Sequence, residues 1–384
     1  MRCLDLDRGW RFRRDGDPVW RPAIVPGSFL ADLERTGLLP DPYFRDNEVL
    51  AKEACESGCE YACEFDLEGP DVSAGAPADL VCLGLDTLCT IFLNGSRVGS
   101  ADNMHRTWRF PVASLLRPGR NALRLRFESA LAFVRQRRQG SDIRYVPTGC
   151  VAGNQYLRKA HCAFGWDWGP QLPDMGIFRS IRLEFPDRAR ILDLRVSQRH
   201  GENRVDLAMH MEAILADGSV PGESPVLQAA VDLLAPDGRR FLAEGPLVGG
   251  RCVLPLSIES PELWWPNNLG GQPLYRLRAV LRLPDGEGDP ASTEAATEAE
   301  TAAATGRELD ARELRIGLRE LGLRREPDAW GESFSFQVNG VPFFAMGADY
   351  VPEDAIPGRR TTERTRRLVR DCARANFNCL RVWG

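Results

Sequence analysis

Residues Phe164–Pro170 place a carboxylate between two indole rings, an arrangement that suits the binding of a sugar. The segment reads Phe-Gly-Trp-Asp-Trp-Gly-Pro, and its glycines and proline keep it from continuing as a strand or a helix. Aromatic faces cover the C–H surface of a sugar ring, and a carboxylate accepts hydrogen bonds from its hydroxyl groups. The same residues could instead form a packing corner, with Asp167 accepting backbone N–H groups. From this segment alone, both interpretations stay open.

The other reactive side chains do not form a metal site. Cys55, Cys59 and Cys63 could be read as ligands, but they lack the spacing of a Cys-x-x-Cys pair and no histidine follows closely. Cys59, Tyr61, Cys63 and Phe65 alternate along the chain, which predicts one buried face of a strand. The 11 cysteines are then small buried hydrophobic residues of a reducing compartment. We expect no metal and no cofactor.

The composition argues against nucleic-acid and membrane partners. The 384-residue chain has a formal net charge of −5, with 43% hydrophobic and 27% charged residues, which is typical of a globular protein of two to three domains. This balance offers no basic surface for nucleic acid or lipid headgroups. The first eight residues carry acids where a signal peptide needs an apolar run, and no apolar stretch approaches the length of a membrane span. We therefore expect a cytoplasmic protein.

The elements that would position the Trp-Asp-Trp segment are strands. The apolar stretch Leu80–Asn94 closes at Asn94-Gly95, a dipeptide that favours a hairpin turn. After the turn at 117–120, apolar residues alternate with arginines, which predicts another strand. Several such strands between Cys59 and Phe185 indicate a sandwich or jelly roll. Residues 1–50 read as an irregular lead-in with short strands.

A second β-rich block runs from about Ala189 to Leu323. Six or seven strands in this length fit an immunoglobulin-like sandwich. The stretch Gly286–Gly306 interrupts it with Ala, Thr, Glu and Gly, and we expect a mobile surface loop there because it has nothing to bury. The candidate strands are Ile191–Arg199, Arg204–Glu212, Val226–Leu234, Arg251–Ile258, Leu274–Leu283 and Arg312–Leu318.

The pattern changes after Pro327. A short strand is predicted over Phe334–Val338, and the apolar run Phe343–Gly347 suits a buried strand. Thr361–Asn376 reads as a helix, and Asn378–Trp383 reads as a second buried strand. This is one parallel β/α unit. A single unit cannot bury both faces of its sheet, so we expect the chain to stop inside a larger fold.

Further motifs accompany the Trp-Asp-Trp segment, at Phe92–Gly95, Asp102–His105, Trp264–Asn267, Gly271–Tyr275, Met346–Pro352 and Asn376–Gly384. Together they resemble glycoside hydrolase family 2 and, within it, the β-mannosidases. The resemblance covers nearly all of the chain, and Trp-Asp-Trp-Gly-Pro is its most specific part. It implies a mostly β fold: a jelly-roll sugar-binding domain over residues 1–188, an immunoglobulin-like β-sandwich domain over 189–325 and the first β/α unit of a truncated (β/α)8 barrel over 326–384.

The resemblance also implies a reaction and a set of sugar-binding residues. In that family, the Trp-Asp-Trp loop leans over the barrel mouth and binds the terminal mannose. The chain would be the N-terminal portion of an exo-β-mannosidase that releases terminal β-D-mannose with retention of configuration, and its partner would be a β-mannoside oligosaccharide or glycan. A homodimer is left open. The substrate-binding residues carried over by position are Trp166, Asp167, Trp168, Asp349, Tyr350, Arg381 and Trp383.

Some of these assignments have structural alternatives. Many relatives carry Asn-Trp where this chain has Asp349 and Tyr350, and Tyr350 could simply pack under a loop. Arg381 either orients the nucleophilic carboxylate and lowers its pKa, as the resemblance implies, or pairs with an acid on an adjacent strand. Lys159 and His161, just before the Trp-Asp-Trp segment, favour a structural role.

No catalytic residue is assigned to this chain. Retaining glycosidases need two carboxylates about 5–5.5 Å apart, and the resemblance implies two glutamates from the fourth and seventh barrel strands, beyond the second strand reached here. Asn47-Glu48 mimics the family's acid/base pair but lies in the wrong domain. Glu353 and Asp354 lie at the barrel rim, where a loop explains them equally well. We therefore expect the chain itself to be inactive.

Two other functions remain open at this point. The chain could be a non-catalytic carbohydrate-binding protein. It could also come from a family 2 β-galactosidase or β-glucuronidase. The first is disfavoured because an isolated β/α unit would expose its apolar strands.

Overall fold

The computed structural model describes residues 1–69, 76–142, 149–222, 227–284 and 306–383, and they are mostly β. They form two compact units. The first unit contains residues 2–185, 349–370 and those from Arg381 on. The second unit contains residues 186–348 and 371–380, with Met1. Each unit is described separately below.

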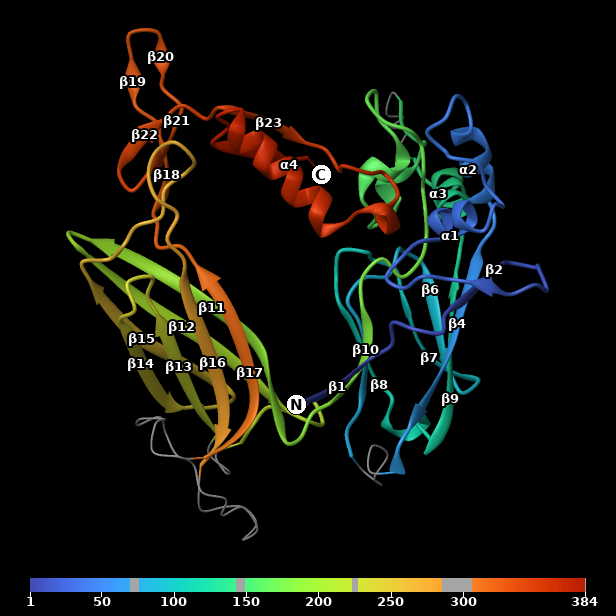
Figure 1. Ribbon diagram of the computed structural model, residues 1–384, viewed down its shortest axis with the longest axis horizontal. Helices are drawn as coiled ribbons and strands as arrows, with labels where there is room; N and C mark the ends of the chain where they lie inside the picture. Colours follow the sequence, from blue (N-terminus) through green and yellow to red (C-terminus); the bar gives the residue numbers. More distant parts are fainter. Residues whose placement is uncertain (70–75, 143–148, 223–226, 285–305, 384) are drawn as a thin grey trace. The chain divides into compact units, whose positions relative to one another are not determined.

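Two antiparallel sheets build the first unit (Figure 1). Buried side chains from both sheets join one hydrophobic cluster, which includes Phe12, Tyr61, Leu80 and Leu183. Ile356, far along the chain, is fully buried in the same cluster. The larger sheet has the order β3-β2-β4-β9-β6-β7 and the smaller one β1-β10-β5-β8. Their strands are β1 (Arg2–Asp5), β2 (Arg11–Arg14), β3 (Arg21–Pro22), β4 (Cys59–Leu67), β5 (Asp79–Cys82), β6 (Cys89–Leu93), β7 (Ser96–Ala101), β8 (Trp108–Pro111), β9 (Gly119–Phe127) and β10 (Ile181–Phe185).

The alternating patterns of this region give the strands that they predict. In β4, Cys59, Tyr61 and Cys63 are buried on one face, opposite β9, where the apolar positions are buried in the same alternation. The predicted hairpin joins β6 to β7, and Asn94 and Gly95 both have positive φ, as that turn requires. The stretch that leads to it is divided between β5 and β6, which lie in different sheets.

Three helices gather at one end of these sheets (Figure 1). They are α1 (Phe29–Arg35), α2 (Glu48–Ala54) and α3 (Ala130–Gln139). The short strands predicted for residues 1–50 are present as β1, β2 and β3, but the lead-in also contains α1, which was not predicted. α2 begins at the end of that stretch and was not predicted either. Each is only seven residues long, and their stability comes from burying side chains such as Phe29, Leu33 and Ala51 rather than from helix propensity.

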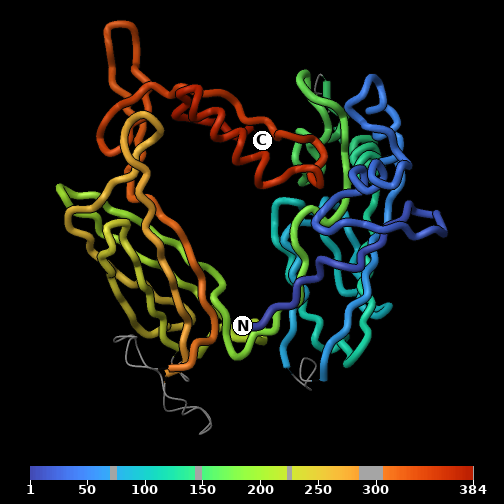
Figure 2. Tube along the Cα trace, viewed as in Figure 1, coloured from blue at the N-terminus to red at the C-terminus, as the bar shows by residue number. Residues whose placement is uncertain are grey.

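Seven described strands form two sheets of the second unit, of order β11-β12-β15 and β14-β13-β16-β17. The long hairpin of β11 and β12 can be followed in Figure 2. Buried residues of both sheets share one cluster, which includes Met209, Leu233 and Tyr275. The strands are β11 (Ala189–Gly201), β12 (Arg204–Leu215), β13 (Gln228–Leu234), β14 (Arg240–Pro246), β15 (Arg251–Glu259), β16 (Tyr275–Leu283) and β17 (Arg307–Ile316).

Six of these strands match the predicted segments, and β14 was missed because its apolar positions are few and half-exposed. The predicted strand that starts at Val226 begins at Gln228, and Val226 itself lies outside the described residues. The predicted mobile loop at 286–306 lies outside them as well, apart from Gly306. The division into three domains stays a prediction.

Residues 321–383 contain short strands and one α-helix. They are β18 (Leu321–Arg324), β19 (Pro327–Asp328), β20 (Gly331–Glu332), β21 (Ser335–Val338), β22 (Val341–Phe343), β23 (Gly347–Tyr350), α4 (Thr362–Arg374) and β24 (Cys379–Val382). β18, β21 and β22 form one sheet, β19 pairs with β20, and β23 forms a two-stranded sheet with β24. The predicted helix is confirmed, although none of its side chains is buried.

The burial predicted for the two apolar strands around this helix was wrong. The run over 343–347 is split, with β22 ending at Phe343 and β23 starting at Gly347, and Phe344 is 81% exposed. In β24, Val382 is 75% exposed. Burial of such strands requires further strands and helices on both faces, and the two-stranded sheet of β23 and β24 has only two strands. Within the described residues, no helix is long and apolar enough to cross a membrane.

Candidate functional site

The tryptophan loop, residues Phe164–Pro170, is a tight turn with exposed indoles. Trp166 and Gly169 exchange backbone hydrogen bonds of 3.4 and 3.5 Å, and Gly165 has φ +85°, which a residue with a side chain rarely adopts. Trp166 is 36% exposed and Trp168 is 41% exposed. Asp167 is also exposed, and its carboxylate accepts no hydrogen bond from the residues that the structure describes. The interpretation of Asp167 as a cap for backbone N–H groups therefore finds no support there.

The base of the tryptophan loop is anchored by apolar packing. Phe164 is fully buried in a small cluster with Leu88, Val134 and Leu157. The Val151 N–H donates to the Phe164 carbonyl at 2.9 Å and ties the loop to the preceding segment. Burying one aromatic ring at the loop's entry while leaving the two indoles outside fixes their position without covering them.

A third tryptophan, Trp383, meets both indoles of the loop. Its ring centroid lies 5.8 Å from that of Trp166 with an interplanar angle of 56°, and 5.1 Å from that of Trp168 in a T-shaped contact of 88°. The Trp383 N–H donates to the Tyr350 carbonyl at 3.0 Å, so the ends of β23 and β24 position this ring. Three of the predicted site residues thus form one aromatic cluster.

Two more predicted residues, Asp349 and Arg381, pair with each other. Arg381 Nη1 lies 3.2 and 3.1 Å from the two carboxylate oxygens of Asp349, and the side chains are 69% and 49% exposed. This is the ion pair with an acid on an adjacent strand, one of the two interpretations of Arg381. An exposed pair of this kind contributes about 0–1 kcal/mol, so a ligand can compete for either partner at little cost.

Beneath the loop lies a fully buried charge cluster. Lys159 is 1% exposed and donates to both carboxylate oxygens of Asp86 at 2.5 Å and to the Asp174 carbonyl at 2.8 Å. Lys159 precedes the tryptophan loop and Asp174 follows it, so one ammonium group joins the two ends of the loop. Burial raises the pKa of Asp174 to about 6, opposed by the Leu30 and Met175 N–H groups that donate to its Oδ1 at 2.9 and 2.8 Å.

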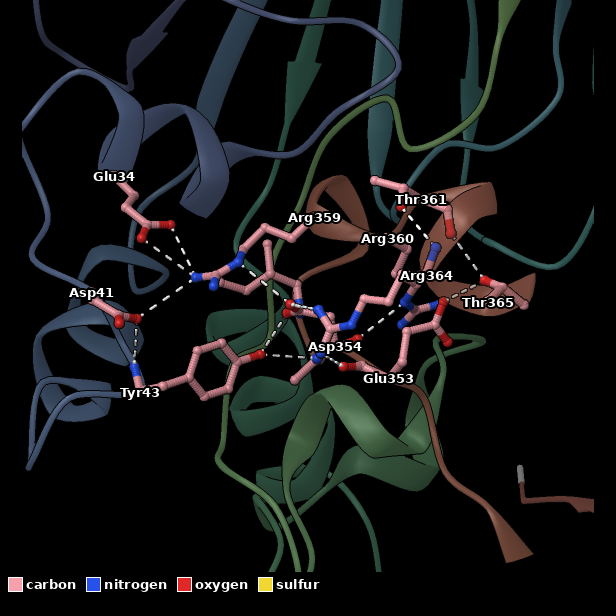
Figure 3. A network of polar contacts seen from close by, with 12 residues as sticks. Glu34, Asp41, Tyr43, Glu353, Asp354, Arg359, Arg360, Thr361, Arg364 and Thr365 are labelled. Carbon is pink, nitrogen blue, oxygen red and sulfur yellow. Dashed lines mark hydrogen bonds and ion pairs between the residues drawn. The ribbon is translucent and has the colours of Figure 1, made fainter. Parts of the chain in front are cut away.

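A second polar network surrounds Asp354, which is 5% exposed (Figure 3). Tyr43 donates to Asp354 Oδ1 at 2.6 Å, Arg364 Nη1 lies 2.9 Å from Oδ2, and Arg359 Nε lies 3.4 Å from Oδ2. Arg359 also pairs with Glu34 at 3.1 Å. Burial and the neighbouring Asp354 charge raise the pKa of Tyr43, so its hydroxyl stays a donor.

This network joins the segment after β23 to the α1 region of the same unit, which explains how Ile356 reaches the first core. The network also shows what the two acids at 353 and 354 contact, which the sequence left open. Asp354 is a structural ion-pair centre. Glu353 accepts hydrogen bonds from Thr365 at 2.6 Å and from Tyr350. Burial works against ionisation of Glu353, but these hydrogen bonds outweigh it and lower its pKa.

Two cavities of the first unit adjoin the aromatic cluster. One, of about 300 Å³, is lined by Trp168, Pro170 and residues of the Asp354 network. The other, of about 590 Å³, is lined by Tyr350, Trp383 and the segment 155–162. His161 is exposed and lines this second cavity, and its predicted structural role stays a prediction. Lys159 lines the same cavity but is buried and bonded to Asp86, in keeping with the structural role predicted for it.

All seven predicted site residues therefore lie in the first unit. Trp166, Trp168 and Trp383 are in contact, Tyr350 shares a cavity with Trp383, and Asp349 pairs with Arg381. No sequence pattern indicated the Asp354 network, because its members come from 34–43 and 354–364, which are 311 residues apart at Tyr43 and Asp354. Among the described residues, no group of three His, Cys, Asp or Glu side chains could hold a metal ion.

The class of protein is indicated by comparison with known sequences. Residues 10–179 match the family of glycosyl hydrolase 2 galactose-binding domain-like domains. β-Mannosidase B of Thermothelomyces thermophilus is 31% identical over 389 residues, and the β-mannosidase of Bos taurus is 26% identical over 399 residues. Each comparison covers 99% of this chain and 42% of the relative.

A solved structure gives the same result. The crystal structure of β-D-mannosidase from Dictyoglomus thermophilum matches 100% of this chain and 44% of its own, with a TM-score of 0.86 and 32% identity. The chain therefore spans less than half the length of these relatives. The resemblance to glycoside hydrolase family 2 and, within it, to the β-mannosidases is confirmed.

Proposed function

We propose that the chain is the N-terminal portion of an exo-β-mannosidase and supplies one wall of its mannose site. The observation that carries this proposal is the contact of Trp166 and Trp168 with Trp383, with the exposed carboxylate of Asp167 between the first two in the chain. The indoles offer apolar faces to the sugar ring, and Asp167 offers an acceptor for its hydroxyl groups. Related sequences named β-mannosidase support mannose as the sugar.

The proposal includes the finer architecture. Residues 1–188 would be a jelly-roll domain, 189–325 an immunoglobulin-like domain, and 326–384 the start of a (β/α)8 barrel. The two sheets of each unit and the succession of β23, α4 and β24 support this division. In such a barrel, active sites lie at the carboxyl ends of the strands, where Tyr350 and Val382 stand in β23 and β24.

Hydrolysis with retention would then need two carboxylates about 5–5.5 Å apart. The acids near the tryptophan loop have other roles: Asp354 is enclosed by arginines, and Glu353 is held by Tyr350 and Thr365. We therefore propose that the 384-residue chain binds β-mannosides but does not hydrolyse them.

Calorimetric titration of the 384-residue chain with methyl β-D-mannoside tests the binding role. We expect saturable binding that Trp168→Ala and Asp167→Ala each weaken at least about tenfold, since each removes a direct contact. Trp330→Ala is the matched control, because Trp330 is 95% exposed on the β19–β20 hairpin of the second unit. Absence of binding, or equal binding by the three variants, would contradict the proposal.

The same titrations separate the sugar alternatives. Methyl β-D-galactoside or methyl β-D-glucuronide binding that is stronger than mannoside binding and depends on Trp168 would favour one of the other family 2 activities. An assay with aryl β-mannoside tests the proposed lack of hydrolysis: turnover by the purified chain would show that its own carboxylates suffice and would contradict this part of the proposal.

A further inference from the structure

The larger cavity beside the aromatic cluster has a basic lining, which distinguishes it from the smaller one. Four exposed side chains around it carry or can carry positive charge: His105, Arg158, His161 and Arg360. No Asp or Glu side chain is among its lining residues in the described part of the chain. Its volume of about 590 Å³ lies within the range of roughly 300–1,000 Å³ that is usual for small-molecule sites.

The donors of this cavity are largely unused. Arg360 donates through Nε to the Asp354 carbonyl at 3.0 Å, and Arg158 has no side-chain partner among the described residues. Gln155 has both amide atoms buried without a hydrogen-bond partner in the same part of the chain. These buried amide atoms are not accessible from the cavity, so the donors that a ligand can reach there are the exposed guanidinium groups of Arg158 and Arg360.

The smaller cavity provides the contrast. Its charged residues include Asp354, Arg359 and Arg364, and these already pair with one another. Glu353, whose pKa is lowered in part by the charge of Arg360, lines this smaller cavity and not the larger one. The charges of the smaller cavity hold the fold together. In the larger cavity Lys159 is likewise paired, with Asp86, whereas the exposed Arg158 and Arg360 side chains remain available to a ligand.

We propose that the larger cavity binds a sugar that carries a carboxylate, with the exposed Arg158 and Arg360 side chains pairing with that carboxylate. Arginine is suited to this because its guanidinium presents two parallel N–H donors to a carboxylate. Trp383 and Tyr350 line the same cavity and offer apolar surface to the ring.

This inference extends the proposed function. The binding of an acidic sugar does not depend on that function, but the assignment of the whole substrate rests on it. Trp383 both lines the cavity and contacts the tryptophan loop, so the two sites adjoin. If mannose occupies the loop, then the neighbouring unit of the substrate is a uronic acid, and the substrate class is an acidic β-mannoside glycan.

The test is calorimetric titration of the 384-residue chain with methyl β-D-glucuronide and with methyl β-D-glucoside, which has the same ring but no carboxylate. We expect the glucuronide to bind at least about tenfold more tightly, since a charge-assisted pair is worth more than a neutral hydrogen bond. Arg158→Ala and Arg360→Ala should each reduce glucuronide affinity at least about tenfold, and high salt should weaken it. Equal affinities for the two glycosides would overturn the proposal.

Three controls keep the outcomes distinct. Arg120→Ala removes another exposed arginine, 75% exposed on β9, and should leave glucuronide affinity unchanged. Inorganic phosphate should bind at least about tenfold more weakly than the glucuronide, and equal binding would indicate a general anion site and overturn the assignment to a sugar. Asp167→Ala should weaken mannoside binding at least about tenfold and leave glucuronide binding intact, so failure of the mannose site does not imitate failure of this one.

Discussion

The charges beneath the tryptophan loop and those beside its exposed face differ in how completely they are paired. Below the loop, Lys159 and Asp86 are almost completely buried and bond to each other through both carboxylate oxygens. Asp354, also buried, is enclosed by a tyrosine and two arginines. On β23 and β24, the strands that lead to Tyr350 and Trp383, Asp349 and Arg381 form a solvent-exposed ion pair.

The difference separates support from recognition. A buried charge must be paired because its desolvation is expensive, and its partners are then fixed in one geometry. An exposed pair is weak and can be exchanged for a ligand. The buried pairs therefore hold the loop and the segment after β23 in place, and the exposed groups remain available for a sugar.

The strongest test of this difference removes the buried cation. Lys159→Met should lower the free energy of unfolding of the first unit by about 3–5 kcal/mol, because it leaves Asp86 buried without its partner. Urea unfolding followed by tryptophan fluorescence measures this. Arg158→Met is the matched control, since Arg158 is the adjacent, exposed residue, and it should change the value by less than about 0.5 kcal/mol. Equal effects would break the distinction between the two sets of charges.

The pH dependence of Asp174 tests the same buried cluster. Its pKa is about 6 in the folded chain against an ordinary 3.8, so between those values folding takes up a proton. The stability that Asp174 contributes is present below pH 4 and is lost as the pH rises through 6. The side chain of the Asp174→Asn variant stays neutral at every pH. As the pH rises from 4 to 7.5, the unfolding free energy of the variant should therefore increase by about 1–3 kcal/mol relative to that of the wild type. Unfolding curves that shift in parallel at both pH values would contradict a raised pKa.

Much of the fold could be predicted because its signals are local. The alternation in β4 and the turn at Asn94-Gly95 depend on residues within one strand or hairpin, and both are confirmed. The burial of Phe344 was predicted wrongly because it depends on which elements cover it, not on its own sequence. The α1 and α2 helices were missed for a related reason, since packing rather than propensity stabilises them.

The candidate site also combines local features, which the sequence predicts, with long-range pairings, which it does not predict. The Trp-Asp-Trp turn is a local feature, so the sequence identifies it. The pairing of Lys159 with Asp86 joins residues 73 positions apart, and that of Tyr43 with Asp354 joins residues 311 apart. Neither pairing leaves a periodic pattern in the sequence. A lysine and acids in apolar surroundings were the only available signal, and that signal gives no partner.

Removal of one hydroxyl from the Asp354 network should have an intermediate effect. Tyr43→Phe removes the 2.6 Å hydrogen bond to Asp354 and leaves the Ala355 N–H without its acceptor. Arg364 and the Ile356 N–H still contact the carboxylate, so we expect a loss of about 1–2 kcal/mol in unfolding free energy. Denaturant titration measures it, with Tyr156→Phe as a second hydroxyl deletion for comparison. No loss would place Asp354 among the loosely held charges.

Substitution of the exposed Asp349–Arg381 pair should change the unfolding free energy least, in contrast to substitutions in the buried pairs. Asp349→Asn removes the charge that Arg381 contacts at 3.1 Å, and the expected change in unfolding free energy is below about 1 kcal/mol because both side chains are largely exposed. A double-mutant cycle with Arg381→Gln isolates their coupling, which should be equally small and should shrink further in high salt. A coupling above about 2 kcal/mol would mean that Asp349 and Arg381 are structural like the buried pairs. A small one leaves the Arg381 guanidinium free to exchange Asp349 for a group on the substrate.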